Sequence, residues 1–109
     1  MNSKTPLINK AERREEDRSF YEEIWIERNH ISDLTGNKIY GELLSSYFHH
    51  LLCKELYPQF RHCKWNICLC EDYLHAQIET NSSLLPTFAL INFIILEDRA
   101  KKLAKQSNV

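Results

Sequence analysis

The middle of the chain predicts two short strands separated by a loop, and this pattern limits the fold more than any other feature. Residues 47–52 and 65–70 are the two predicted strands, and residues 56–64 form the loop, which contains a Tyr-Pro pair. In the second strand, Ile67 and Leu69 share one face and alternate with other side chains. A small two-stranded unit is therefore the predicted centre of the fold.

Helices are predicted on both sides of this unit. Two acidic residues follow the second strand, and because acidic side chains favour the positive end of a helix, a helix is predicted from there to near Asn81. A long N-terminal helix is predicted over residues 10–30 and a C-terminal helix over residues 82–109. We expect a single α+β domain of 109 residues, in which these two helices brace the core at residues 31–81.

The two flanking helices differ in where their apolar residues lie. Residues 12–18 of the N-terminal helix are polar all round and are interpreted as a solvated surface with Glu–Arg pairs three or four residues apart. In the C-terminal helix, residues 88–96 are predicted to pack, with Ser82 or Ser83 as the N-cap and Pro86 in the first turn. The apolar residues in the last turns of the N-terminal helix are Phe20, Tyr21, Ile24 and Trp25, with Ile26 as a further candidate.

The charge balance argues against a strongly basic nucleic-acid-binding protein. The chain has 14 Lys and Arg residues against 15 Asp and Glu residues, for a formal net charge of -1. This balance predicts no strong attraction to nucleic acid or to an acidic membrane. A polyanion would therefore have to bind at a local patch, helped by a metal ion. The presence of only 2 Gly residues also argues against a glycine-rich phosphate loop.

The cysteines and the N-terminal residues point to a reducing compartment. Residues 1–18 are polar and lack the apolar stretch of a secretory leader, so secretion is not expected. The longest apolar run, residues 84–96, is shorter than the roughly 20 residues that span a bilayer. We expect a cytoplasmic protein with no membrane partner and with reduced thiols at its four cysteines. These cysteines are Cys53, Cys63, Cys68 and Cys70.

Five polar residues of the central region have the chemistry of a catalytic site. His49 and His50 lie in the first predicted strand, Asn66 in the second, and His75 in the helix that follows. Glu79 follows His75 by four residues, so both lie on one helix face. Because adjacent strand residues point to opposite sides, His49 and His50 can serve one site only if the strand is distorted or ends there.

The order of these residues and elements resembles the HNH endonuclease family, and in particular its small phage-type members. The sequence HHLLCKELYPQFR at residues 49–61, WNICL at residues 65–69, and His75 carry the resemblance. The sequence LTGNKI at residues 34–39 resembles the hairpin that precedes this core. The resemblance covers residues 25–81, and it implies a ββα-metal fold and metal-dependent hydrolysis of DNA phosphodiester bonds.

The resemblance also implies a role for each site residue. His50 would be the general base that takes a proton from the attacking water, and Asn66 would bond to loop backbone and hold His50 in place. His49 and His75 would hold one divalent metal ion, with Glu79 as a candidate third ligand. Such ligands fit Mg, Mn, Ni or Zn to different degrees. The cations expected to contact DNA phosphates are Lys54, Arg61 and Lys64.

The chain departs from the family at the place where many members bind a structural zinc ion through two Cys pairs. Ser32 and Thr35 stand at the position of the first pair, and only Cys70 remains near His75. We therefore predict no structural zinc site and expect the flanking helices to brace the core instead.

Other interpretations are open from the sequence. The protein is, in one of them, an inactive or repurposed HNH fold that binds or inhibits a host or phage partner; its small size, near-zero charge and missing Cys pairs favour this. A homodimer is also open, because two nicking subunits would together make a double-strand break. In a third interpretation four residues form a zinc module, although zinc sites usually show two tight Cys pairs. These four are Cys63, Cys68, Cys70 and His75.

The remaining histidines and both tryptophans are assigned ordinary structural positions. His30 and His62 are expected on the surface. Trp25 and Trp65 are expected in the core rather than at a base-stacking surface.

Overall fold

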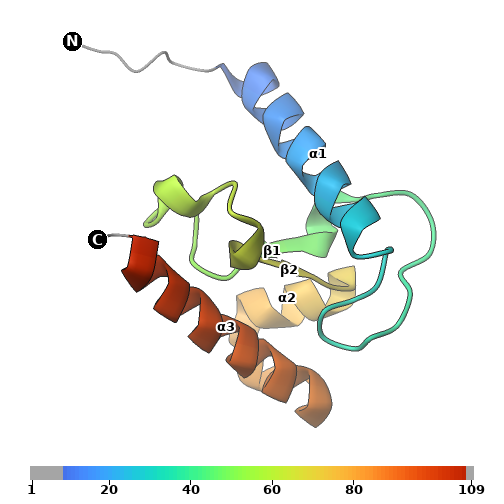
Figure 1. Cartoon of the computed structure of the whole chain (residues 1–109). Helices are drawn as coiled ribbons and strands as arrows, with labels where there is room; N and C mark the ends of the chain where they lie inside the picture. The colour runs from blue at the N-terminus through green and yellow to red at the C-terminus, as the bar shows by residue number, and fades with distance from the viewer. Residues whose placement is uncertain (1–8, 108–109) are drawn as a thin grey trace.

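In the computed structural model, which describes residues 9–107, three helices surround a two-stranded antiparallel sheet (Figure 1). This arrangement confirms the predicted α+β class, with a small ββα core between an N-terminal and a C-terminal helix. The last two residues of the predicted C-terminal helix lie outside the described residues. The elements are α1 (Lys10–Glu27), β1 (Phe48–His50), β2 (Ile67–Leu69), α2 (Asp72–Asn81) and α3 (Thr87–Ser107).

The strands lie where they were predicted but are only three residues long. Phe48 pairs with Leu69, His49 with Cys68, and His50 with Ile67. Short 3₁₀ turns at Ser45–Tyr47 and Lys64–Asn66 come directly before the two strands and prevent either from starting earlier. The predicted spans of six residues were therefore too long, because these turns redirect the backbone before each strand begins.

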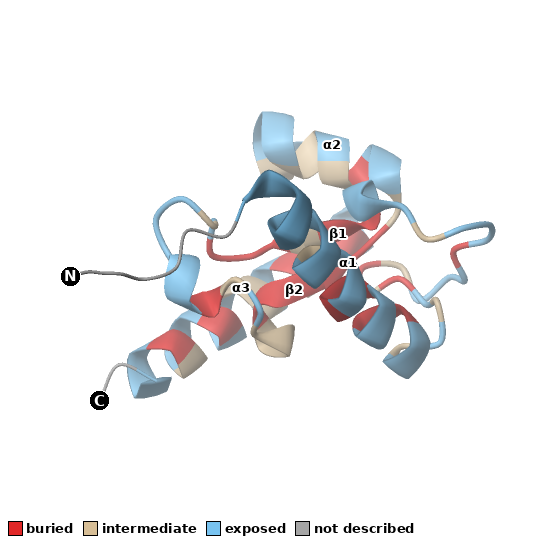
Figure 2. Cartoon of the chain, turned by 90° about the horizontal axis from the view of Figure 1, so that it is seen from above, coloured by how far each residue is buried: buried red, intermediate tan, exposed pale blue. Residues whose placement is uncertain are grey.

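The sheet separates two apolar clusters, which lie on its opposite faces. On one face, Phe48, Ile67 and Leu69 pack against the last turns of α1. On the other face, Cys68 packs in a cluster that includes residues of α3, the loop and α2. The strands and the adjoining segments are buried, as the red ribbon of Figure 2 shows. The predicted alternation in β2 is confirmed, because its residues divide between the two clusters. The two flanking helices thus brace the sheet from both sides, as expected.

α1 begins at a side-chain cap and ends where the backbone turns left-handed. The Asn9 side chain accepts a hydrogen bond from the Glu12 amide at 2.9 Å, which satisfies one free donor of the first turn. Asn29 and His30 have φ angles of 55° and 60°, a conformation that terminates helices. α1 therefore stops at Glu27, before the predicted end at residue 30. Of the apolar residues in its last turns, the first four are buried, whereas the further candidate Ile26 is exposed.

The predicted Glu–Arg pairs along α1 are absent. Among residues 9–107, no ion pair joins two side chains of α1. Its charged residues pair with the loop instead: Asp17 with Arg61 and His62, and Glu23 and Glu27 with Lys64. The charge pattern of this helix is therefore organised by tertiary contacts rather than by its own turns.

α2 matches its predicted bounds, whereas α3 starts later than predicted. Ser82–Leu84 forms a separate 3₁₀ turn, and Leu85 is extended, as the residue before a proline favours. Pro86 lies before α3 rather than in its first turn, and its carbonyl accepts a hydrogen bond from the Leu90 amide at 2.9 Å. The helix predicted from residue 82 is thus divided into two pieces.

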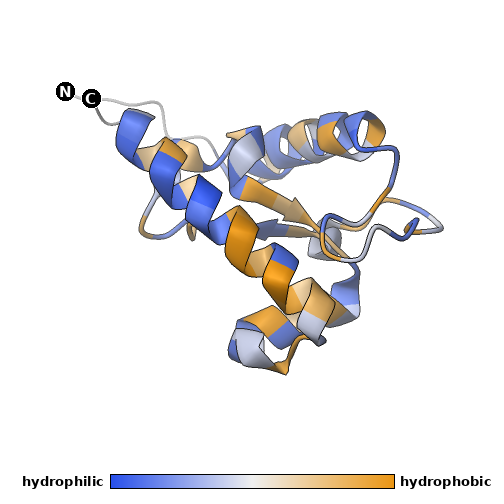
Figure 3. Cartoon of the chain, turned by 60° about the horizontal axis from the view of Figure 1, so that its bottom comes forward, coloured by the Kyte–Doolittle hydropathy of each residue, from blue (hydrophilic) through white to orange (hydrophobic). Residues whose placement is uncertain are grey.

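α3 is apolar in its first half and charged in its second half (Figure 3). Its buried face carries Ala89, Phe93, Ala100 and Ala104, and Asn92 donates a hydrogen bond to the Leu34 carbonyl at 2.8 Å. Within the described residues, no single helix has both the length and the apolar composition to cross a membrane. Residues 72–84 and 87–107 reach that length and composition only when they are taken together, and a 91° bend separates them.

Candidate metal centre and catalytic residues

β1 and α2 bring three potential metal ligands together. Ligand atoms of His49, His75 and Glu79 all lie within 4.8 Å of one another, and within residues 9–107 this is the only such group of three or more. The rings of His49 and His75 are 5.1 Å apart, and His75 Nε2 lies 3.9 Å from a Glu79 carboxylate oxygen. Ligands about 2 Å from one ion lie at most about 4 Å apart, so this group would have to close to enclose a cation.

A hydrogen bond at His75 and burial at His49 favour the forms of these side chains that bind a metal ion. His75 Nδ1 donates to the Ser46 carbonyl at 2.6 Å, which leaves its Nε2 lone pair free on the side of Glu79. Burial, with smaller contributions from the charges of His75 and His50, lowers the pKa of His49 to about 4. His49 is therefore neutral at pH 7, which is the form of imidazole that binds a metal ion.

His50 points to the face of the sheet opposite His49, toward α1. Its Nε2 lies 3.0 Å from the Arg61 carbonyl, and because a carbonyl only accepts, the ring proton is on Nε2. Nδ1 is therefore the basic nitrogen. Burial lowers the pKa of His50, and the bond to the Arg61 carbonyl opposes this effect. The side chain is 9% exposed, so its position is closely defined by its neighbours.

The two adjacent histidines nevertheless border the same cavity, because β1 ends at His50. This cavity, of about 250 Å³, is called the catalytic cavity below, after the candidate catalytic and metal-binding residues that line it. The sequence predicts that the two histidines can serve one site only if the strand is distorted or ends there, and β1 does end there. The residues that line the cavity are Phe48, His49, His50, Cys53, Lys54, Glu55, His75 and Glu79.

Asn66 holds the loop that positions His50. Its side chain is fully buried, accepts a hydrogen bond from the Leu52 amide at 2.8 Å, and donates to the carbonyls of Leu52 and Phe60 at 3.1 and 3.2 Å. Phe60 precedes Arg61, whose carbonyl holds the His50 ring. Asn66 thus acts on the site through the backbone, in the manner that the sequence resemblance implies.

The three predicted phosphate-binding cations occupy different environments. Lys54 lines the catalytic cavity. Arg61 instead makes two hydrogen bonds to Asp17, at 2.7 and 3.1 Å, which raise the pKa of Arg61. Lys64 lies 2.5 Å from Glu27, and this contact raises the pKa of Lys64. The structure therefore brings only Lys54 to the cavity.

Hydrogen bonds occupy the position where the family resemblance would place a structural zinc ion. Thr35 donates from its hydroxyl to a Glu71 carboxylate oxygen at 2.8 Å, and Ser32 Oγ accepts from the Leu34 amide at 3.1 Å. The cysteines of the alternative zinc module do not form a metal-binding group within residues 9–107. A hydrogen bond with Cys70 and burial raise the pKa of the Cys68 thiol, which disfavours the thiolate that zinc requires.

The remaining aromatic residues fit their assignments except at His30. Trp25 is buried, and Trp65 packs partly buried beside Phe60. His62 is exposed and contacts Asp17 at 2.8 Å. His30, predicted on the surface, is half-buried because its ring stacks on Trp25 with a centroid separation of 4.1 Å.

Sequence reasoning missed Arg28, which fixes the second strand. Its guanidinium donates to Asp33 at 2.6 Å and to the carbonyls of Ile67 and Lys64 at 2.8 and 2.9 Å. Asp33 in turn accepts a hydrogen bond from the Leu69 amide at 2.8 Å. No sequence motif distinguishes Arg28 from the other arginines of the N-terminal region.

No protein-family model matches this chain, and no curated protein or solved structure shows detectable similarity to it. We therefore infer the function from the residues of the site and their geometry.

Proposed function

We propose that this protein is a metal-dependent endonuclease of the HNH type that hydrolyses DNA phosphodiester bonds. The observation that carries the proposal is the shared cavity of His49, His50, His75 and Glu79. It combines a neutral buried base with a candidate metal-binding group, and backbone carbonyls hold the rings of His50 and His75. The resemblance to HNH proteins is consistent with each of these positions.

His50 is the general base in this proposal. Its Nε2 donates to the Arg61 carbonyl, so Nδ1 is free to take a proton from the attacking water. Because its pKa is lowered, the ring is neutral at pH 7 and can accept a proton. The Arg61 carbonyl then stabilises the positive charge that the ring acquires. Asn66 is a positioning residue, because it fixes the loop and makes no contact with the reacting atoms.

His49, His75 and Glu79 are the residues that would hold the metal ion. Two neutral imidazoles and one carboxylate fit Mg, Mn, Ni or Zn to different degrees. When bound, a divalent ion polarises the scissile phosphate and stabilises charge on the leaving oxygen. Lys54 lines the same cavity and would contact a phosphate oxygen beside the cleaved bond.

Cleavage of supercoiled plasmid DNA tests the proposal. The purified full-length protein is incubated with Mg, Mn, Ni or Zn, and EDTA is the metal-free control. We expect metal-dependent nicking or linearisation, which is lost in His50→Ala and retained in His62→Ala. His62 is the matched control because its ring contacts Asp17 and Phe20 of α1 but lies outside the catalytic cavity.

The proposal is wrong if no metal supports cleavage by well-folded protein, or if His50→Ala cleaves as fast as the parent. Circular dichroism of each variant shows whether the fold is intact. Complete absence of cleavage would favour the alternative of a non-catalytic protein that binds a host or phage partner, and partner capture would then be the next experiment.

A further inference from the structure

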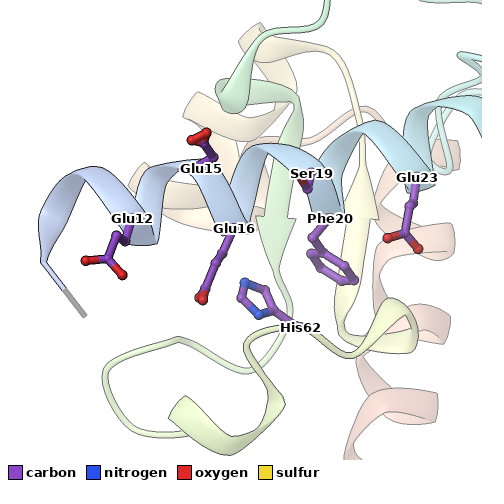
Figure 4. Close-up of a pocket in the computed structure, with 7 residues that line it drawn as sticks. All are labelled: Glu12, Glu15, Glu16, Ser19, Phe20, Glu23 and His62. Atoms are coloured by element: carbon purple, nitrogen blue, oxygen red, sulfur yellow. The ribbon is translucent and has the colours of Figure 1, made fainter. Parts of the chain in front are cut away.

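α1 separates two hollows of opposite charge. The first, called the acidic hollow, has a volume of about 670 Å³ and lies between α1 and the loop that carries His62 (Figure 4). In this hollow the His62 ring lies near Glu16 and Phe20. The residues that line it are Glu12, Glu15, Glu16, Ser19, Phe20, Glu23 and His62, and they include no Lys or Arg.

The second hollow, called the basic cleft, has a volume of about 590 Å³. Arg14 and Arg18 of α1 contribute two of its three cations, and Lys54 of the loop contributes the third. The stacked rings of Tyr21 and Phe48, with centroids 4.3 Å apart, supply an apolar surface. The remaining lining residues are Asp17, Leu43, Ser45, Ser46 and His75.

The basic cleft is continuous with the catalytic cavity. Phe48, Lys54 and His75 line both spaces, so Lys54 and the candidate metal ligand His75 stand where they meet. A strand whose phosphate lies in the catalytic cavity therefore has a direct path along the cleft. The acidic hollow shares none of its lining residues with the catalytic cavity.

The charges of the basic cleft are available to a ligand. Arg14 and Arg18 have no ion-pair partner within the described part of the chain. They are four residues apart on one helix face, a spacing at which like charges repel. The only carboxylate of the cleft, Asp17, is already bound by Arg61 and His62. The cleft is therefore positive on a chain whose formal net charge is -1.

We propose that Arg14 and Arg18, together with Lys54, bind the phosphate backbone of the DNA strand next to the cleaved bond. This inference rests on the proposed nuclease function and adds α1 to the substrate-binding surface. A phosphodiester backbone fits this cleft because it presents regularly spaced anions to the cations and sugar surfaces to the apolar wall. The carboxylates of the acidic hollow repel the same backbone and restrict the strand to one side of α1.

The salt dependence of DNA binding tests this inference. Binding of a fluorescein-labelled 25-base-pair duplex to full-length protein is measured by anisotropy between about 50 and 200 mM salt, in the His50→Ala background to prevent cleavage. The metal that supports plasmid cleavage is included. Arg14→Gln/Arg18→Gln is compared with Arg13→Gln/Arg99→Gln, which removes the same net charge from exposed residues that do not line the cleft.

We expect Arg14→Gln/Arg18→Gln to weaken binding at least tenfold at 50 mM salt. Each lost phosphate contact lowers the slope of log K against log salt by about 0.9, so this variant should lower it by about 1.8. The control pair should change affinity less than twofold. On a background with His50 intact, the cleft variant should raise KM and leave kcat within twofold, because its residues do not reach the reacting atoms.

Two outcomes overturn the inference, and they differ in what they mean for the nuclease. If the cleft variant and the control pair bind DNA equally while the parent protein cleaves, α1 is not part of the substrate surface and the proposed function stands. If the parent protein neither cleaves plasmid nor binds the duplex, the nuclease proposal and this inference are both wrong.

Discussion

The two hollows beside α1 are similar in size, about 670 and 590 Å³, but they differ in charge and in what they adjoin. His62 lines the acidic hollow, whereas the basic cleft shares lining residues with the cavity of His50 and His75. The larger hollow is thus the one without candidate catalytic residues. Chemistry and connectivity, rather than volume, distinguish the site, and the predictions below test this distinction.

The largest effect on stability is expected at Asn66, whose loop borders both hollows. Asn66→Ala removes three hydrogen bonds and leaves the Leu52 amide and two carbonyls buried without these partners. We expect the free energy of unfolding to fall by about 4 kcal/mol. Urea denaturation measures this change. A loss below about 1 kcal/mol would show that the loop does not depend on Asn66.

A second prediction concerns acid stability and separates His49 from His62. The folded pKa of His49 is about 4, below its unfolded value of 6.5, so the unfolded chain binds the proton more readily. This contribution to stability is complete above pH 6.5 and is lost as pH falls from 6.5 toward 4. The loss from this group approaches about 3 kcal/mol.

Denaturation of the metal-free protein in EDTA across pH 4–7 measures this loss. His49→Gln should flatten the pH dependence, because the titrating group is gone, and His62→Gln should retain most of it. Equal pH profiles for the parent and His49→Gln would show that His49 does not carry this titration.

Metal affinity should also distinguish the two regions. His75→Ala removes one imidazole of the metal-binding group, and we expect binding of Mn or Zn to weaken about 100-fold. Glu79 is the most exposed of the three ligands, so Glu79→Gln should weaken binding about tenfold. Isothermal titration calorimetry measures both changes. If His62→Ala weakens binding as much as His75→Ala, the metal lies elsewhere.

The smallest effect is expected in the acidic hollow. Glu12→Gln/Glu16→Gln removes two of its carboxylates, neither of which borders the catalytic cavity. If DNA follows only the basic cleft, duplex affinity should rise less than threefold through the change in net charge alone. A larger increase would indicate that the strand passes close to this hollow as well. The anisotropy assay with the labelled duplex measures this difference.

Local sequence signals predicted the centre of the fold well. The strand–loop–strand–helix order and the bounds of α2 follow from nearby residues and short-range patterns, whereas the bonds of Asn66 to the loop backbone were expected only from the family resemblance. A helix spacing of four residues predicts that His75 and Glu79 share one face, whereas their grouping with His49 was implied by the family resemblance alone.

Features that depend on tertiary contacts were not predictable in the same way. The pairs of Arg61 with Asp17 and of Lys64 with Glu27 join residues far apart in sequence, so these cations were assigned to DNA instead. For the same reason α1 was interpreted as a helix with internal pairs. The early end of α1 depends on left-handed backbone at Asn29, which no turn motif in the sequence marks.

The rate of plasmid cleavage by His50→Ala, compared with His62→Ala, tests the central claim most directly. One histidine borders the catalytic cavity and the other the acidic hollow. Single-turnover rates at saturating metal and DNA isolate the chemical step. Loss of a general base predicts a rate about 100- to 10,000-fold lower for His50→Ala and a rate within twofold of the parent for His62→Ala. Equal rates for the two variants would contradict the assignment of the catalytic cavity.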